Sequence, residues 1–148
     1  MAVYTPITLK DLSKFLSNYN LGKIIKFEGI LEGVENTNFK IKTSKNNYIL
    51  TIFEKRVNKK DLPFFISLQK HLSNKKIKCP KPIPDIKNKY IKKFKNKNCV
   101  IMSFLKGKKL KKVSKEHCFQ LGKELANMHK HTRDFRKKRK NDLNQSNW

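Results

Sequence analysis

Three short runs of strand-forming residues follow one another between positions 24 and 53, with few residues between them. Ile24 to Leu31 is rich in β-branched and aromatic residues, and in Phe39 to Thr43 apolar and polar side chains alternate. A polar turn, Ser44 to Asn47, leads into the third run, Tyr48 to Phe53. Parallel neighbours need a connection of a dozen or more residues, so such short connections predict an antiparallel meander.

Amphipathic helices are predicted on either side of this meander. Thr8 and Asp11 have the spacing of a capping box, and the helix that they begin should stop at Asn20-Leu21-Gly22. A second helix should begin at Asp61 as its cap, and a third at Ser114. The stripes expected to face a core are Leu9, Leu12, Phe15, Leu16 and Tyr19 in the first, Leu62, Phe65, Leu68 and Leu72 in the second, and Cys118, Leu121, Leu125 and Met128 in the third.

Two more strands are predicted after the second helix. Cys79 to Pro84 should be a stiff extended linker, because each proline biases the preceding residue away from the helical conformation. Tyr90 to Phe94 and Cys99 to Leu105 should then pair as a hairpin around Asn96 to Asn98. The resulting order predicts an α+β fold, a five-stranded antiparallel sheet with flanking helices, which is the layout of the N-terminal lobe of protein-kinase-like folds. Fold alone does not settle function.

The formal net charge of +25 comes from 32 Lys and only 4 Arg, in a chain that also has 15 Asn. A nucleic-acid-binding surface is one explanation, since phosphates attract clustered positive charge. The other is an AT-biased genome, because Lys and Asn share A-rich codons. A surface selected to bind phosphates or bases would use more Arg, whose planar fork suits bidentate contacts. The lysines are also scattered, so we favour the second explanation and expect no nucleic-acid partner.

No apolar run approaches the roughly 20 residues that a membrane-spanning helix needs, and the first residues lack the pattern of a signal peptide. Cys79, Cys99 and Cys118 are odd in number and far apart, which is typical of reduced thiols. We therefore expect a cytoplasmic protein without membrane contact. The oligomeric state stays open.

The turn between the first two predicted strands, Gly33 to Phe39, begins with a glycine and continues with short polar side chains. A glycine here lets backbone N–H groups approach a polyphosphate, and Asn36 and Asn38 add donors. An ordinary hairpin turn has the same composition. The turn is neither a GxGxxG motif nor a Walker loop, so a phosphate-binding role depends on its context.

That context is a resemblance to the aminoglycoside phosphotransferase and choline kinase superfamily, whose nucleotide loop is similar to Gly33-x-x-Asn36-x-x-Phe39. Within it, nearly the whole chain resembles the bacterial homoserine kinases, less so in the Lys-rich hairpin and the tail. The similar stretches are Val3 to Leu9, Glu32 to Phe39, Tyr48 to Val57, Asp61 to Phe65, Cys79 to Pro82, Ser103 to Gly107 and the helix from His117 to His129.

The resemblance implies ATP-dependent phosphorylation of the side-chain hydroxyl of L-homoserine, a step toward threonine, with Mg²⁺ assisting. In such enzymes the nucleotide lies between two lobes, and the adenine meets the backbone of a hinge strand, with one side chain behind the ring. The implied hinge residues are Ser103, Phe104 and Leu105, with Met102 behind the ring; those implied at the phosphates are Gly33, Val34, Asn36, Asn38, Thr51 and Lys55.

The third strand departs from the general kinase pattern, which places a Lys there to hold the α- and β-phosphates. Thr51 occupies that position, and Lys55 is the first basic residue of the same strand parity. Lys55 either takes over the phosphate role or is a solvated lysine at a strand end. The following helix carries Gln69 and no Glu, so we assign no ion pair.

The residues that would transfer the phosphoryl group in this superfamily are missing: an Asp in a His-Gly-Asp type loop, a nearby Asn and a second Asp for Mg²⁺. Asp134 follows the third helix directly and is expected to be a surface residue. We therefore expect a kinase-like N-terminal lobe with its hinge at residues 1–107 and the start of a truncated C-terminal lobe at 108–148, inactive alone. Two alternatives remain: a small basic nucleic-acid-binding protein, and a related kinase with another acceptor.

Overall fold

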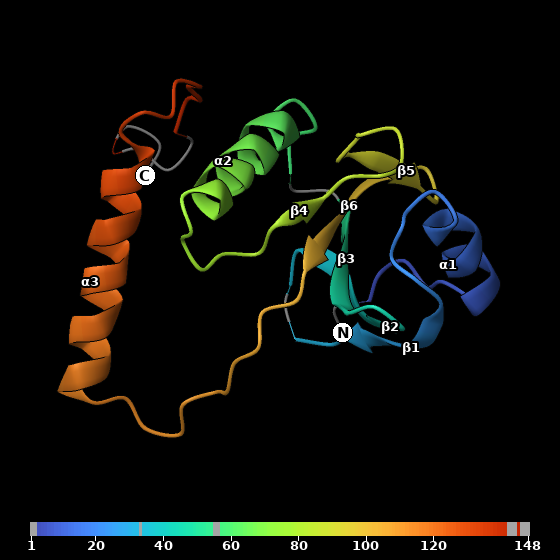
Figure 1. Ribbon diagram of the computed structural model, residues 1–148, viewed down its shortest axis with the longest axis horizontal. Helices are drawn as coiled ribbons and strands as arrows, with labels where there is room; N and C mark the ends of the chain where they lie inside the picture. Colours follow the sequence, from blue (N-terminus) through green and yellow to red (C-terminus); the bar gives the residue numbers. More distant parts are fainter. Residues whose placement is uncertain (1–2, 33, 55–56, 142–144, 146–148) are drawn as a thin grey trace.

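The computed structural model describes residues 3–32, 34–54, 57–141 and 145, and contains three helices and six strands in these ranges. Figure 1 shows the sheet between α1 on one side and α2 on the other, with α3 set apart. The elements are α1 (Leu9–Leu16), β1 (Ile24–Ile30), β2 (Asn36–Thr43), β3 (Asn47–Phe53), α2 (Leu62–Asn74), β4 (Pro82–Ile83), β5 (Lys92–Phe94), β6 (Lys97–Ser103) and α3 (Lys115–Thr132).

The strands form one antiparallel sheet in the order β1-β2-β3-β6-β4, and β5 also pairs with β6. The predicted meander and the α+β fold class are thus confirmed, with one strand more than expected. The extra strand, β4, lies inside the predicted linker Cys79 to Pro84, where the extended backbone that the prolines impose runs beside β6. The last hairpin turns at Lys95 and Asn96, which both have positive φ.

Each face of the sheet packs into its own core, because side chains alternate along every strand. Ile41 of β2, Leu50 of β3 and Ile101 of β6 face α1 and are fully buried. Val100 and Met102 of β6 face the other way and pack with Ile66 of α2. The two cores therefore share β6, which among the described residues contributes fully buried side chains to both, while Ile49 and Phe53 of β3 pack partly buried against the α2-side core.

Helix α1 has the predicted capping box, with reciprocal bonds between Thr8 and Asp11. It ends at Leu16, earlier than predicted, and Tyr19 reaches the core from the following turn. Gly22 has φ +84°, a left-handed backbone conformation that glycine adopts without steric strain. The prediction was wrong for Leu9, which is exposed at the start of the helix.

Helix α2 begins one residue after Asp61, but the Asp61 side chain makes no capping bond. Its carboxylate instead accepts a hydrogen bond from Arg139 Nε at 2.7 Å. Leu62 and Leu72 are buried as predicted, but the prediction was wrong for Phe65, which is 38% exposed, and Ile66 is buried instead. The Phe65 ring lines a cavity.

Helix α3 begins at the predicted cap, Ser114, whose hydroxyl accepts from the N–H of His117. Its expected core face was wrong: Leu121 is 71% exposed and Leu125 46%. Residues 104–114 form an extended segment that separates α3 from the sheet. The C-terminal end of α3 approaches α2 (Figure 1). Within the described residues no helix is long and apolar enough to cross a membrane, and Cys79, Cys99 and Cys118 are free thiols.

The α1-side core predicts a strong effect of truncating a central strand. Ile52→Ala removes a fully buried side chain of β3 and should lower the free energy of unfolding by about 3 kcal/mol. Ile25→Ala, on a β1 residue that is 60% exposed, should change it by less than about 0.5 kcal/mol. Urea unfolding followed by circular dichroism measures both, and equal losses for the two variants would contradict this packing.

Candidate functional site

A cavity of about 460 Å³ opens on the face of the sheet that α2 covers. Its floor is β3 and the end of β6, one wall is α2, and the other is the chain that follows β6. Most of the side chains around it are apolar, which suits a flat aromatic ring better than a charged group. The lining residues are Ile49, Thr51, Phe53, Val57, Phe65, Ile66, Gln69, Pro80, Met102, Ser103, Phe104 and Leu105.

Five of the residues singled out from the sequence meet here: Thr51 and the run Met102 to Leu105. Thr51 is near the middle of β3, opposite Val100 of β6. Sequence reasoning missed Ile49 and Phe53, although both have the same strand parity as Thr51 and the period of two was a sufficient signal. The contribution of Phe65 and Pro80 depends on how α2 and the linker pack, which no local pattern shows.

The start of β2, which follows the β1–β2 turn, is connected to this cavity by hydrogen bonds. Thr51 donates its hydroxyl proton to Asn38 Oδ1 at 2.8 Å, and Asn38 Nδ2 donates to the Asn36 carbonyl at 3.4 Å. The Asn36 side-chain oxygen is buried without a hydrogen-bond partner in the part of the chain that the structure describes. Val34 lies farther out and is 75% exposed. Gly33 and Lys55 lie outside the described residues.

The backbone at the end of β6 already makes hydrogen bonds within the protein. The Ser103 N–H donates to the Lys81 carbonyl at 2.8 Å, and its hydroxyl accepts from the Lys81 N–H at 2.9 Å. The Phe104 N–H donates to the Asn47 carbonyl at 3.3 Å, so β4 and β3 both hold the end of β6. Just after β6, the centre of the Phe104 ring lies 4.8 Å from Lys40 Nζ.

The polar side chains that line the cavity are neutral: Thr51, Gln69 and Ser103. Gln69 comes from α2 and Thr51 from β3, so the cavity wall and floor meet without an ion pair between these two positions. Among the described residues, no three His, Cys, Asp or Glu side chains are close enough together to hold a metal ion.

Behind the turn, on the α1 face of the sheet, Glu54 forms a buried polar cluster. Its carboxylate pairs with Lys97 and accepts hydrogen bonds from the hydroxyls of Thr5, at 2.7 Å, and Thr37, at 2.6 Å. Burial would raise the pKa of Glu54, but the bonds from Lys97, Thr37 and Thr5 outweigh it and hold the pKa below its ordinary value. Glu54 therefore remains ionised near neutral pH.

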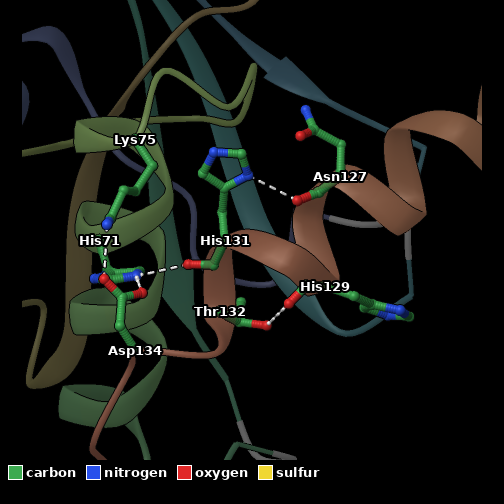
Figure 2. A network of polar contacts seen from close by, with 7 residues as sticks. All are labelled: His71, Lys75, Asn127, His129, His131, Thr132 and Asp134. Atoms are coloured by element: carbon green, nitrogen blue, oxygen red, sulfur yellow. Dashed lines mark hydrogen bonds and ion pairs between the residues drawn. The ribbon is translucent and has the colours of Figure 1, made fainter.

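A second polar network fastens the end of α3 to α2 (Figure 2). His71 Nε2 lies 2.8 Å from the His131 carbonyl and 3.1 Å from Asp134 Oδ1, and Lys75 Nζ lies 2.6 Å from Asp134 Oδ2. Asp134 is a surface residue, as predicted, and the Lys75 hydrogen bond lowers the pKa of its carboxyl. The Phe135 ring packs on His71, so the tail contributes contacts that its polar composition did not predict.

The comparisons with known proteins agree over most of the chain. A model of the phosphotransferase enzyme family matches residues 26–147. Homoserine kinases of Sinorhizobium medicae and Methylobacterium radiotolerans are 43% and 45% identical to this chain over all 148 of its residues. Those residues cover 45% and 46% of the two relatives, so the chain spans about half the length of the curated proteins it matches.

The fold has a solved counterpart. The crystal structure of a spectinomycin phosphotransferase, in complex with ADP and spectinomycin, superposes with a TM-score of 0.66 at 17% identity. The match covers 86% of this chain and 39% of that one. At this identity the similarity establishes the fold, and the predicted kinase-like lobe is confirmed.

The Glu54 cluster predicts a pH-dependent stability. Because the folded pKa of Glu54 is lowered, its contribution is present above its unfolded pKa, near 4.5, and is lost as pH falls through the folded value. Glu54→Gln should cost about 2 kcal/mol at pH 7, and the difference from wild type should shrink toward pH 3. The control, Glu28→Gln, removes an exposed partner of Lys26 and should change little. Urea unfolding at both pH values measures this; a cost independent of pH would contradict it.

Proposed function

The chain belongs to the phosphotransferase enzyme family, and from that membership we propose that it is the nucleotide-binding part of an ATP-dependent homoserine kinase. The observation that carries the proposal is identity of 43% and 45% to two homoserine kinases over every residue of the chain. The reaction is transfer of the ATP γ-phosphoryl group to the side-chain hydroxyl of L-homoserine, giving O-phospho-L-homoserine for threonine biosynthesis in the cytoplasm.

The cavity under the sheet is the proposed adenine site. An adenine ring between Ile49 and Phe104 would bury its faces on apolar side chains, with Met102 behind it. The edge of the adenine ring needs one hydrogen-bond donor and one acceptor from the hinge backbone. Because the N–H groups of Ser103 and Phe104 already donate within the protein, we assign the donor to Leu105.

The phosphates would extend from this ring toward the β1–β2 turn and the start of β2, where Gly33 and Val34 of the turn and Asn36 and Asn38 of the strand would supply backbone and amide groups. A neutral Thr51 and a neutral Gln69 cannot balance a polyphosphate charge. We therefore propose Lys55, just after β3, as the balancing cation. Mg²⁺ would reach the site bound to the phosphates, since the described residues include no acidic cluster to hold it.

The domain division follows from the same proposal. Residues 1–107 would form the nucleotide-binding lobe with its hinge, and residues 108–148 would begin the lobe that binds L-homoserine. The chain spans about 45% of its homoserine kinase relatives, and the Asp of a His-Gly-Asp loop is not in its sequence. We therefore propose that nucleotide binding belongs to this chain and phosphoryl transfer to the complete enzyme.

The hinge assignment is tested by removing a single N–H group. Leu105→Pro lacks the donor, whereas the control Leu105→Ala keeps it and loses more of the side chain, so weaker binding by the proline variant would not come from lost apolar contact. Isothermal titration calorimetry should give a dissociation constant for Mg²⁺–ADP about tenfold larger for the proline variant than for the alanine variant. If both folded variants bind ADP equally, Leu105 is not the hinge donor.

The acceptor is tested with a chimera. This chain, joined to the remaining part of the Sinorhizobium medicae homoserine kinase, should form O-phospho-L-homoserine when ATP, Mg²⁺ and L-homoserine are all present, as mass spectrometry would detect. The control chimera carries the remaining part of the spectinomycin phosphotransferase and should phosphorylate neither spectinomycin nor homoserine, because the lobe contacts of that protein are too different. Activity of the control alone would contradict the assignment.

A further inference from the structure

The N-terminal segment crosses the α1 face of the sheet before the first helix begins. Val3 packs against the α1-side core, and a side chain on Gly29 of β1 would come within 2.8 Å of Val3 Cγ2. Gly29 therefore leaves room for the segment to lie directly on the strand. This close approach brings residues 3–5 to the end of the β1–β2 hairpin.

At that end the segment bonds to the first residues of β2. The backbone N–H groups of Tyr4 and Thr5 donate to Thr37 Oγ1 at 2.9 and 3.1 Å. Thr37 is fully buried, and its hydroxyl donates a hydrogen bond to the Glu54 carboxylate. Thr5 donates to the same Glu54 oxygen and accepts from Lys97. The segment, the start of β2 and the end of β3 are thereby fixed to one another.

The segment also reaches the turn itself. The Tyr4 hydroxyl donates to the Val34 carbonyl at 3.1 Å, across an exposed part of the surface. This contact lies beyond the β1–β2 ladder, whose register ends at Ile30 and Asn38. Val34 lies beyond the last ladder pair, where sheet hydrogen bonds do not restrain it.

We propose that Tyr4 and Thr5 are positioning residues for the nucleotide's phosphates: they hold the β1–β2 turn, through Val34 and Thr37, in the conformation that receives a polyphosphate. The inference rests on the proposed nucleotide-binding function and deepens it. A turn that binds through its backbone loses affinity when it must first be ordered, so fixing it beforehand strengthens binding of the phosphates. The adenine, held by the hinge on the far side of Thr51, gains nothing from these contacts.

The test removes one hydroxyl. Tyr4→Phe keeps the ring and removes the hydrogen bond to Val34. The matched control, Tyr90→Phe, removes the hydroxyl of a ring that lies beside Lys70 of α2. Calorimetry with the full chain should show that Tyr4→Phe weakens Mg²⁺–ADP binding three- to tenfold. Its affinity for adenosine should stay within twofold of wild type, and the control should match wild type for both ligands.

A second pair of variants covers the buried contact. Thr37→Ser keeps the hydroxyl that receives the Tyr4 and Thr5 N–H groups and should bind ADP like wild type, whereas Thr37→Val should repeat the selective loss. Equal ADP affinity in Tyr4→Phe and wild type, or an equal loss for ADP and adenosine, would overturn the positioning role and leave nucleotide binding intact. Failure of the folded wild type to bind Mg²⁺–ADP would overturn the nucleotide-binding function itself.

Discussion

Strand β6 joins the two hydrophobic cores, and the rest of the fold depends on it. Cys99 and Ile101 are buried toward α1, whereas Val100 and Met102 are buried toward α2. Its edges pair with β3 on one side and with β4 and β5 on the other. A strand restrained on both faces and both edges has little freedom, so the residues that follow it begin at a fixed place. The position of this strand therefore fixes where Ser103, Phe104 and Leu105 line the cavity.

The chemistry of the cavity differs from the general kinase arrangement at one pair of positions. Kinases hold the α- and β-phosphates with a Lys on the third strand, paired with a Glu from the next helix. Here Thr51 and Gln69 face the same cavity from β3 and α2. No ion pair can therefore form between these two side chains. Apolar packing of Ile66 on Val100 and Met102 holds α2 against the sheet at this point.

Helix α3 was predicted correctly as a helix, but the burial of its apolar face was predicted wrongly. Its capping residue and apolar stripe are evident in the sequence, yet Leu121 and Leu125 are exposed. What attaches the helix is polar and aromatic: Asp134 bonds to α2 and Phe135 packs on His71. Both residues lie in a tail whose composition predicted little structure. An apolar stripe indicates that a face can be buried, and the neighbouring elements decide whether it is.

The sequence by itself determined the meander and the caps at Thr8 and Ser114, because strand alternation, short turns and capping spacings are local properties. It also singled out Thr51 and residues 102–105, through strand parity and family resemblance, and these residues line one cavity. Only the tertiary structure decided that Phe65 and Gln69 complete the cavity and that Tyr4 reaches Val34. Such contacts join residues far apart in the chain, and their geometry is set by how helices and segments pack on the sheet, which no local pattern encodes.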